Sequence, residues 1–109
     1  MFDDYKLNRH RFKELKHFCL QYPEWRMRYD ELYGSGNVEE EGILKADFIR
    51  AVELIEMTAF DTDPLLSSYI LRYVTHDESI RTVDPPCDAL IFKYLLNKFY
   101  WLLSERKGV

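Results

Sequence analysis

The sequence contains few of the residues that build disulfide frameworks and long loops. Its 109 residues include only two cysteines, four glycines and four prolines. Two cysteines are too few for the disulfide framework of a small secreted domain, which favours a reduced, cytoplasmic setting. No apolar run approaches the roughly 18 residues that a membrane span needs. The acidic pair Asp3 and Asp4 is untypical of a secretory signal, so we expect a cytoplasmic protein without a membrane partner.

The sequence also lacks the basic excess that is typical of proteins that grip nucleic acid through phosphates. Nineteen acidic and fifteen basic residues give a net charge of -4. The charge is uneven along the chain, because residues 38–65 hold eight acids and only two bases. The segments on either side each hold one more base than acid. The middle of the chain therefore supplies all of the net negative charge.

No segment alternates between apolar and polar residues with a period of two, so we expect no sheet. Apolar residues recur at three- and four-residue steps, which predicts an all-α fold, a compact bundle of five to six helices. The chain is expected to form one domain, residues 1–109, because its length suits one core. Within it we expect an N-terminal helical hairpin, a linker and a C-terminal helical core, over residues 7–33, 34–42 and 43–105.

Helix starts are predicted from capping patterns. Asn37 and Glu40 have the spacing of a capping box, and so do Thr75 and Glu78. Asp63-Pro64 is typical of the first residues of a helix. Together with apolar spacing and with Pro23 and Gly34 as the limits of the second helix, these signals place helices at about 7–20, 23–33, 37–60, 64–74 and 88–105, with a short one before residue 84. The predicted core is Phe48, Ile55, Ile70, Leu95, Phe99 and Leu102.

Motifs for catalysis or metal binding are missing. His10, Glu14 and His17 share one helix face, but the neighbouring lysines favour a solvated surface over a metal site. Cys87 precedes a helix start, where a thiol can become reactive, yet its apolar, proline-rich surroundings favour a structural role. There is no glycine-rich phosphate loop and no nucleophile elbow. We therefore expect a binding protein that is not an enzyme and uses no cofactor or metal.

Basic side chains form two groups, one on the first helix and one on the last. The last three expected helices have the order of a helix-turn-helix, with the final one as the reading helix. Its first residues, which include Asp88, Ala89, Ile91 and Phe92, offer no Arg, Asn or Gln to base edges. The candidate DNA-contacting residues are Arg9, Arg11, Lys13, Lys16, Lys93 and Lys98.

Several segments of the sequence resemble small prophage proteins of Gram-positive bacteria. These segments are Leu20–Arg26, Tyr69–Thr75, Pro86–Cys87, Phe92–Tyr94 and Lys98–Leu103. They are also distantly similar to helix-turn-helix activators of phage late genes. The resemblance implies a DNA-binding transcriptional regulator of a phage or mobile element. The chain departs from that pattern after Cys87, where positions that tend to be basic in such proteins are Asp88 and Ala89.

The charge balance indicates a second function class, an acidic protein that inhibits a basic host defence protein in the manner of an anti-CRISPR protein. Such a protein occupies the partner's basic surface with carboxylates. The resemblance favours duplex DNA as the partner by a small margin, and both functions stay open from the sequence. The candidate residues for protein binding are Glu39, Glu40, Glu41, Glu53 and Glu56.

Overall fold

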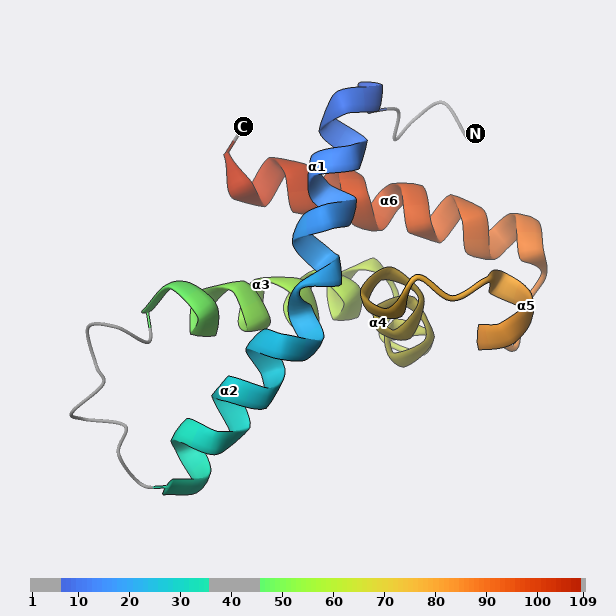
Figure 1. Ribbon diagram of the computed structural model, residues 1–109. Helices are drawn as coiled ribbons and strands as arrows, with labels where there is room; N and C mark the ends of the chain where they lie inside the picture. The colour runs from blue at the N-terminus through green and yellow to red at the C-terminus, as the bar shows by residue number, and fades with distance from the viewer. Residues whose placement is uncertain (1–6, 36–45, 109) are drawn as a thin grey trace.

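A computed structural model describes residues 7–35 and 46–108 of the chain (Figure 1). These residues form helices and connecting turns and contain no strand, which confirms the all-α prediction. The predicted linker and the Asn37–Glu40 capping box lie outside the described residues. No helix in the described ranges is long and apolar enough to cross a membrane. The helices are α1 Arg9–Leu20, α2 Tyr22–Ser35, α3 Ala46–Thr62, α4 Ser67–His76, α5 Ile80–Val83 and α6 Ala89–Lys107.

Short polar side chains begin three of these helices. The Asn8 side chain accepts a hydrogen bond from the backbone N–H of His10 at 2.8 Å and begins α1. Ser79 caps α5 through the N–H of Thr82. Asp88 caps α6 through the N–H of Leu90. Each cap satisfies one of the N–H groups that have no partner within the helix.

The predicted capping box at Thr75 and Glu78 is wrong. Thr75 is buried in the last turn of α4, where its hydroxyl donates to the carbonyl of Leu71 at 2.7 Å. The chain leaves α4 at Asp77, whose φ of 52° is left-handed, and Ser79 begins the next helix instead. Burial of Thr75 on the face of α4 that carries Ile70 and Val74 explains why the helix continues past the predicted stop.

Asp63 does not begin α4 directly, as Asp63-Pro64 predicted. Its carboxylate accepts from the N–H groups of Leu65 and Leu66 and holds a turn, and α4 begins at Ser67. An Asx turn is an alternative to a helix cap for the same side chain. The turn separates α3 from α4 and leaves Leu65 89% exposed.

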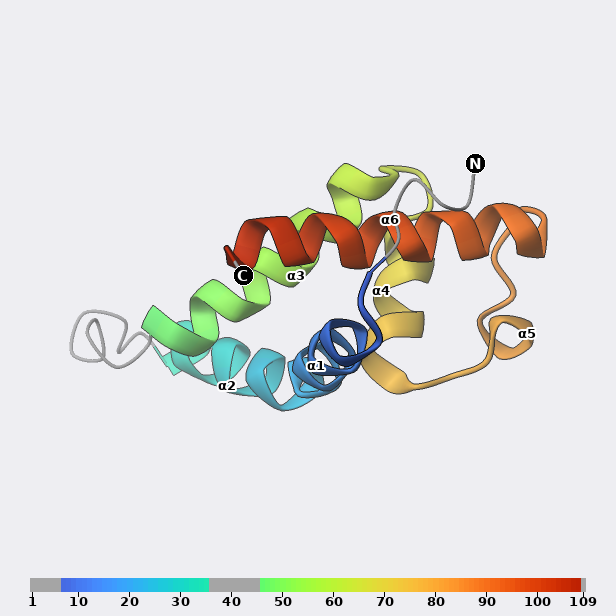
Figure 2. The ribbon, with the colours of Figure 1, turned by 90° about the horizontal axis from the view of Figure 1, so that it is seen from above.

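Helix α3 is the centre of the fold, because it packs against α2, α4 and α6. Helices α3 and α6 run in opposite directions, and α1 crosses α6 (Figures 1 and 2). Four of the six predicted core residues are buried, namely Ile55, Ile70, Leu95 and Phe99. Phe48 and Leu102 were predicted incorrectly and are only half-buried. The largest fully buried side chains are Phe92, Phe99, Leu15, Ile55, Ile70 and Leu103.

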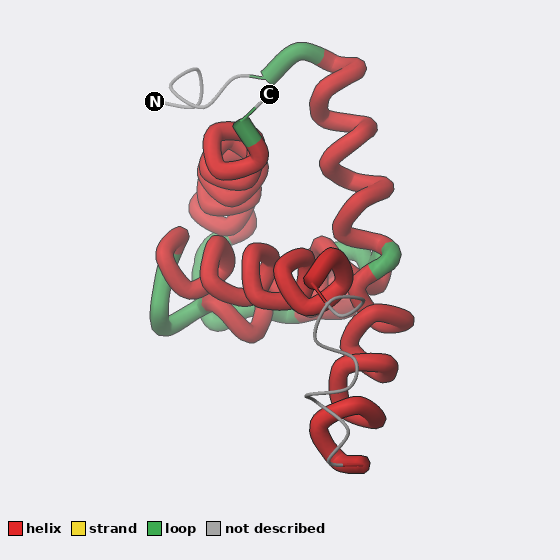
Figure 3. The backbone as a smooth tube through the Cα atoms, turned by 90° about the vertical axis from the view of Figure 1, so that its left-hand side faces the viewer, coloured by secondary structure: helices red, strands yellow, loops and turns green. Residues whose placement is uncertain are grey.

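Residues 7–33 do not form the predicted hairpin. Only Gln21 separates α1 from α2, and one residue gives the chain no room to reverse. Helix α2 instead packs against α3 and extends away from α6 (Figure 3). Among the α2 side chains whose burial the structure describes, only Tyr22 and Leu32 are buried. We call α2 and α3 together the α2–α3 pair; α2 is its outer, largely solvated member.

Candidate functional site

Charge is separated between the helices of the fold. The α2–α3 pair carries seven acidic and three basic residues, whereas α1 carries four basic residues and one acidic residue. The described residues from 63 to 108 include six acidic and six basic residues. The α2–α3 pair is therefore acidic in net charge and α1 is basic.

A side-chain network attaches α2 to α3. The Tyr22 hydroxyl donates to the Glu56 carboxylate, and the Arg26 guanidinium pairs with the same carboxylate at 3.0 Å. Arg26 also pairs with Asp30 at 3.1 Å and lies over the Tyr29 ring. Burial first, and the hydrogen bond to Glu56 second, raise the pKa of Tyr22. The phenol therefore remains a hydrogen-bond donor throughout the physiological range of pH.

This network assigns the predicted binding residue Glu56 to a structural contact, since its carboxylate joins the two helices. Glu53, one turn earlier on α3, is exposed and has no ion-pair partner among the described residues. Glu39, Glu40 and Glu41 lie outside the described residues. Three acids that the sequence did not single out are likewise exposed and unpaired within the described ranges, namely Glu24, Glu31 and Asp47.

Large apolar side chains accompany these carboxylates on the α2–α3 pair. Met27, Tyr33 and Met57 are exposed by 64%, 45% and 60%. Aromatic residues and methionine are enriched in protein interfaces. The sequence did not single out these residues, because apolar spacing alone does not distinguish a buried helix face from an exposed one. The weak segregation of apolar residues around α2 is the signal that could have indicated an exposed helix.

A shallow hollow lies where α1, α2 and α3 meet. It has a volume of about 470 Å³ and includes the rings of Phe18, Trp25 and Phe48 in its lining. Arg28 lies over the Phe48 ring at 4.9 Å, and Asp47 supplies a carboxylate at the same hollow. The α2–α3 pair thus combines an aromatic depression with free acidic groups.

Three of the six predicted DNA-contacting residues are engaged within the fold. Arg11 donates to the Ser104 hydroxyl at 3.1 Å and pairs with Glu14. Lys16 pairs with Asp77 at 3.5 Å, and the Lys98 ammonium donates to the carbonyl of Thr62 at 3.2 Å. The other three are exposed and form no ion pair with a described residue, namely Arg9, Lys13 and Lys93.

The start of α6, predicted as the reading end, has an apolar surface. The Asp88 carboxylate already accepts a hydrogen bond from the backbone N–H of Leu90. The side chains of Leu90 and Ile91 are exposed by 60% and 53%. Phe92 was grouped with the reading residues but is fully buried in the core. No basic side chain projects from the first turn of α6.

Neither cysteine has the environment of a reactive thiol. Burial raises the pKa of Cys19 to about 12, and Lys107 offsets only a part of that effect. Partial burial, followed by the charges of Asp88 and Asp63, raises the pKa of Cys87 as well. A nucleophilic thiol needs the opposite shift. Within the described ranges, no group of three or more His, Cys, Asp and Glu side chains could hold a metal ion.

Comparisons of the chain with protein families, with curated proteins and with solved structures found no match.

Proposed function

We propose that this chain is a non-enzymatic protein-binding module whose α2–α3 pair binds a basic partner protein. The observation that carries the proposal is the charge of this pair, which has seven acidic residues and only three basic ones. Two of the three bases are already engaged, Arg26 with carboxylates and Arg28 with the Phe48 ring. Glu24, Glu31, Asp47 and Glu53 are left to meet a partner's positive charge.

The two kinds of side chain on this surface have different roles in binding. Exposed carboxylates steer the encounter with a positive surface and select against acidic partners. Met27, Met57 and the aromatic hollow supply apolar area, which contributes most of the affinity of a typical interface. A nucleic-acid-binding protein presents the basic surface that this arrangement fits. The partner class is therefore a basic host protein, such as a nucleic-acid-binding defence effector.

A helix-turn-helix-like regulator of phage type is the second candidate. The order α4, α5, α6 and the basic surface of α1 favour it. Helix α5 has only four residues, however, and the first turn of α6 offers Leu90 and Ile91 in place of base-reading side chains. Of the predicted DNA-contacting residues, only Arg9, Lys13 and Lys93 form no ion pair or hydrogen bond with a described residue and could bind phosphates. We therefore place protein binding first.

Two charge reversals, one on each surface, distinguish these functions. Glu24→Lys, Glu31→Lys and Glu53→Lys together reverse the α2–α3 pair, and Arg9→Glu with Lys13→Glu reverses α1. All five positions are exposed, so both variants should stay folded, which far-UV circular dichroism would check. A partner captured from lysate of the host cell would be identified, and its association rate measured against each variant.

We expect the reversal on the α2–α3 pair to slow association at least tenfold, because rim charges act mainly on the encounter rate. The reversal on α1 should leave that rate nearly unchanged. Binding of the unmodified chain to random duplex DNA should be weaker than about 10 µM at physiological salt. A tight DNA complex that is lost on reversal of α1 and kept on reversal of the α2–α3 pair would refute protein binding and support the regulator.

A further inference from the structure

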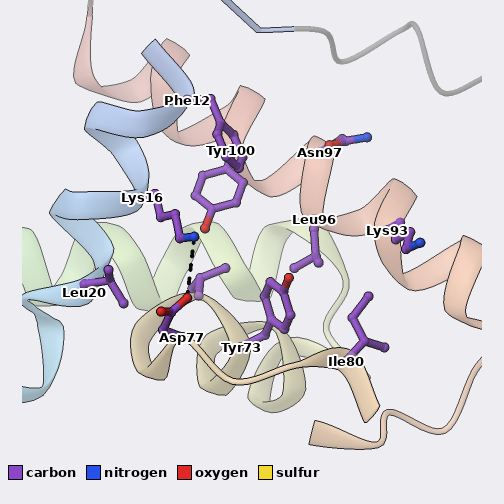
Figure 4. A pocket seen from close by; sticks show the side chains of 11 residues that line it. Phe12, Lys16, Leu20, Tyr73, Asp77, Ile80, Lys93, Leu96, Asn97 and Tyr100 are labelled. Atoms are coloured by element: carbon purple, nitrogen blue, oxygen red, sulfur yellow. Dashed lines mark ion pairs between the residues drawn. The ribbon is translucent and has the colours of Figure 1, made fainter. Parts of the chain in front are cut away.

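A hollow of about 290 Å³ lies between α1, the C-terminal end of α4 and the middle of α6 (Figure 4). Its lining includes the aromatic rings of Phe12, Tyr73 and Tyr100 and the aliphatic side chain of Leu96. Phe12 is 38% exposed, so part of this apolar lining is in contact with solvent. Removal of apolar area from water is favourable. An apolar side chain of another molecule can therefore be buried in the hollow.

Free basic side chains lie on two sides of this hollow. Lys93 lines it from α6, across the hollow from α1 (Figure 4). On α1, Arg9, Lys13 and Lys16 recur at steps of four and three residues and so share one helix face. Lys16 lines the hollow and pairs with Asp77 at 3.5 Å. The other three bases are exposed and form no ion pair with a described residue. The hollow therefore has positive charge on both sides that a bound molecule can neutralise.

The outer face of α2 has the complementary pattern. Glu24, Met27 and Glu31 follow one another at steps of three and four residues, so they share one helix face. All three are exposed, Met27 by 64%, and neither glutamate forms an ion pair with a described residue. The two glutamates lie about 10 Å apart along the helix axis, one turn on either side of the methionine. We call these three residues the acidic stripe.

We propose that the acidic stripe of one copy of this chain binds the hollow of a second copy. Met27 enters the hollow, and the carboxylates of Glu24 and Glu31 pair with the free bases on its two sides. The unbranched thioether of methionine adapts to irregular apolar spaces and packs favourably against aromatic rings, of which the hollow has three. Because the stripe and the hollow are different surfaces of one chain, the contact is heterologous.

The apolar lining favours a second copy over duplex DNA as the molecule bound in this hollow. The phosphates of a duplex would meet the free bases, but a duplex has no flexible apolar group to fill the space between them. The proposal uses the outer face of α2 and does not depend on a host partner. One methionine and two ion pairs make a small contact, so we expect a Kd of about 0.1–1 mM. The chain therefore remains monomeric at the micromolar concentrations of a kinetic binding assay.

A dilution series of the ¹⁵N-labelled full chain, from about 2 mM to about 20 µM, tests the contact across the expected Kd. Saturable amide shifts should be confined to α2 around residues 24–31 and to the hollow around residues 9–20, 73–80 and 93–100. Met27→Gln should weaken self-association at least about fivefold, because a polar amide replaces the buried thioether. Met57→Gln is the matched control and should leave the Kd unchanged. Met57 is also exposed, by 60%, but lies on α3 outside the acidic stripe.

Charge reversals test the ion pairs of the contact. Glu24→Lys with Glu31→Lys reverses the acidic stripe, and Arg9→Glu with Lys13→Glu reverses the free bases of α1. Each variant alone should self-associate about tenfold more weakly, because like charges then face each other in every contact. In an equimolar mixture the two variants should associate with about the Kd of the unmodified chain. The unchanged stripe of one variant then meets the unchanged hollow of the other.

Four results would each overturn the proposal. The first is an absence of saturable shifts up to about 2 mM. The second is an equal effect of Met27→Gln and Met57→Gln, and the third is a mixture of the reversed variants that associates no more tightly than either alone. The fourth is a set of shifts at the hollow that a short random duplex produces and added unlabelled chain does not, which would indicate DNA as the ligand. None of these measurements contains a host protein, so a negative result leaves the proposed function of the α2–α3 pair to its own test.

Discussion

Replacing Glu56 by alanine should destabilise the protein far more than replacing Glu53, although both are glutamates on α3. The Glu56 carboxylate accepts from the Tyr22 hydroxyl and pairs with Arg26 at 3.0 Å, whereas Glu53 has no ion-pair partner among the described residues. The comparison isolates the contact that holds α2 on α3, because the two substitutions are chemically identical and lie on the same helix.

The magnitude follows from the two contacts. Both members of the Arg26–Glu56 pair are more than one-third exposed, so this pair contributes about 0.2–1 kcal/mol. The hydrogen bond from Tyr22 is worth more, about 1.5 kcal/mol, because its acceptor is charged and Tyr22 is only 7% exposed. Glu56→Ala should therefore lower the free energy of unfolding by about 2 kcal/mol. Glu53→Ala should change it by less than about 0.5 kcal/mol.

Urea unfolding followed by circular dichroism measures both values. Tyr22→Phe completes a double-mutant cycle with Glu56→Ala, and a coupling energy of at least about 1 kcal/mol is expected for two groups in direct contact. Added salt should reduce the contribution of the Arg26–Glu56 ion pair to the free energy of unfolding and leave the contribution of the Tyr22 hydrogen bond unchanged. Equal effects of Glu56→Ala and Glu53→Ala, or a coupling energy near zero, would refute the assignment of Glu56 to the fold.

Two further predictions concern the core. Leu95→Ala should cost roughly 2–5 kcal/mol by the same urea assay, because Leu95 is buried, while Leu90→Ala on the exposed face of α6 should cost less than about 0.5 kcal/mol; a loss below about 1 kcal/mol for Leu95→Ala would contradict its place in the core. Burial raises the pKa of Cys19 from 9.0 to about 12, so its contribution to stability is complete below about pH 9 and is lost as the pH rises toward 12. Between about pH 8 and 11, the free energy of unfolding should therefore fall less for the Cys19→Ala variant than for the unmodified chain. Parallel plots of this free energy against pH would contradict the burial of the thiol.

The helices could be predicted from the sequence because helix formation depends mainly on residues that are close together in the chain. Three- and four-residue spacing of apolar side chains is typical of a helix, and the helix predicted at about 88–105 corresponds to α6, Ala89–Lys107. The predicted ends were less accurate. Thr75 had the spacing of a capping residue, but its burial against neighbouring helices kept it within α4, and no local pattern records that burial.

The candidate sites depend on contacts between residues far apart in the sequence. Arg11 was predicted to contact DNA, yet its partner Ser104 lies 93 positions away and could not be known from the sequence. Glu53 and Glu56 are equivalent in the sequence, and only the packing of α2 on α3 separates a free carboxylate from a structural one.

The sequence by itself thus determined an all-helical chain, most of its helix positions and the acidic character of its middle segment. These properties depend on spacing, capping and charge along neighbouring residues. The tertiary structure decided which charges remain free, which face of α6 is buried and where a hollow opens. Those outcomes depend on how helices pack, since burial and pairing are set by residues from several helices that meet only in the folded chain.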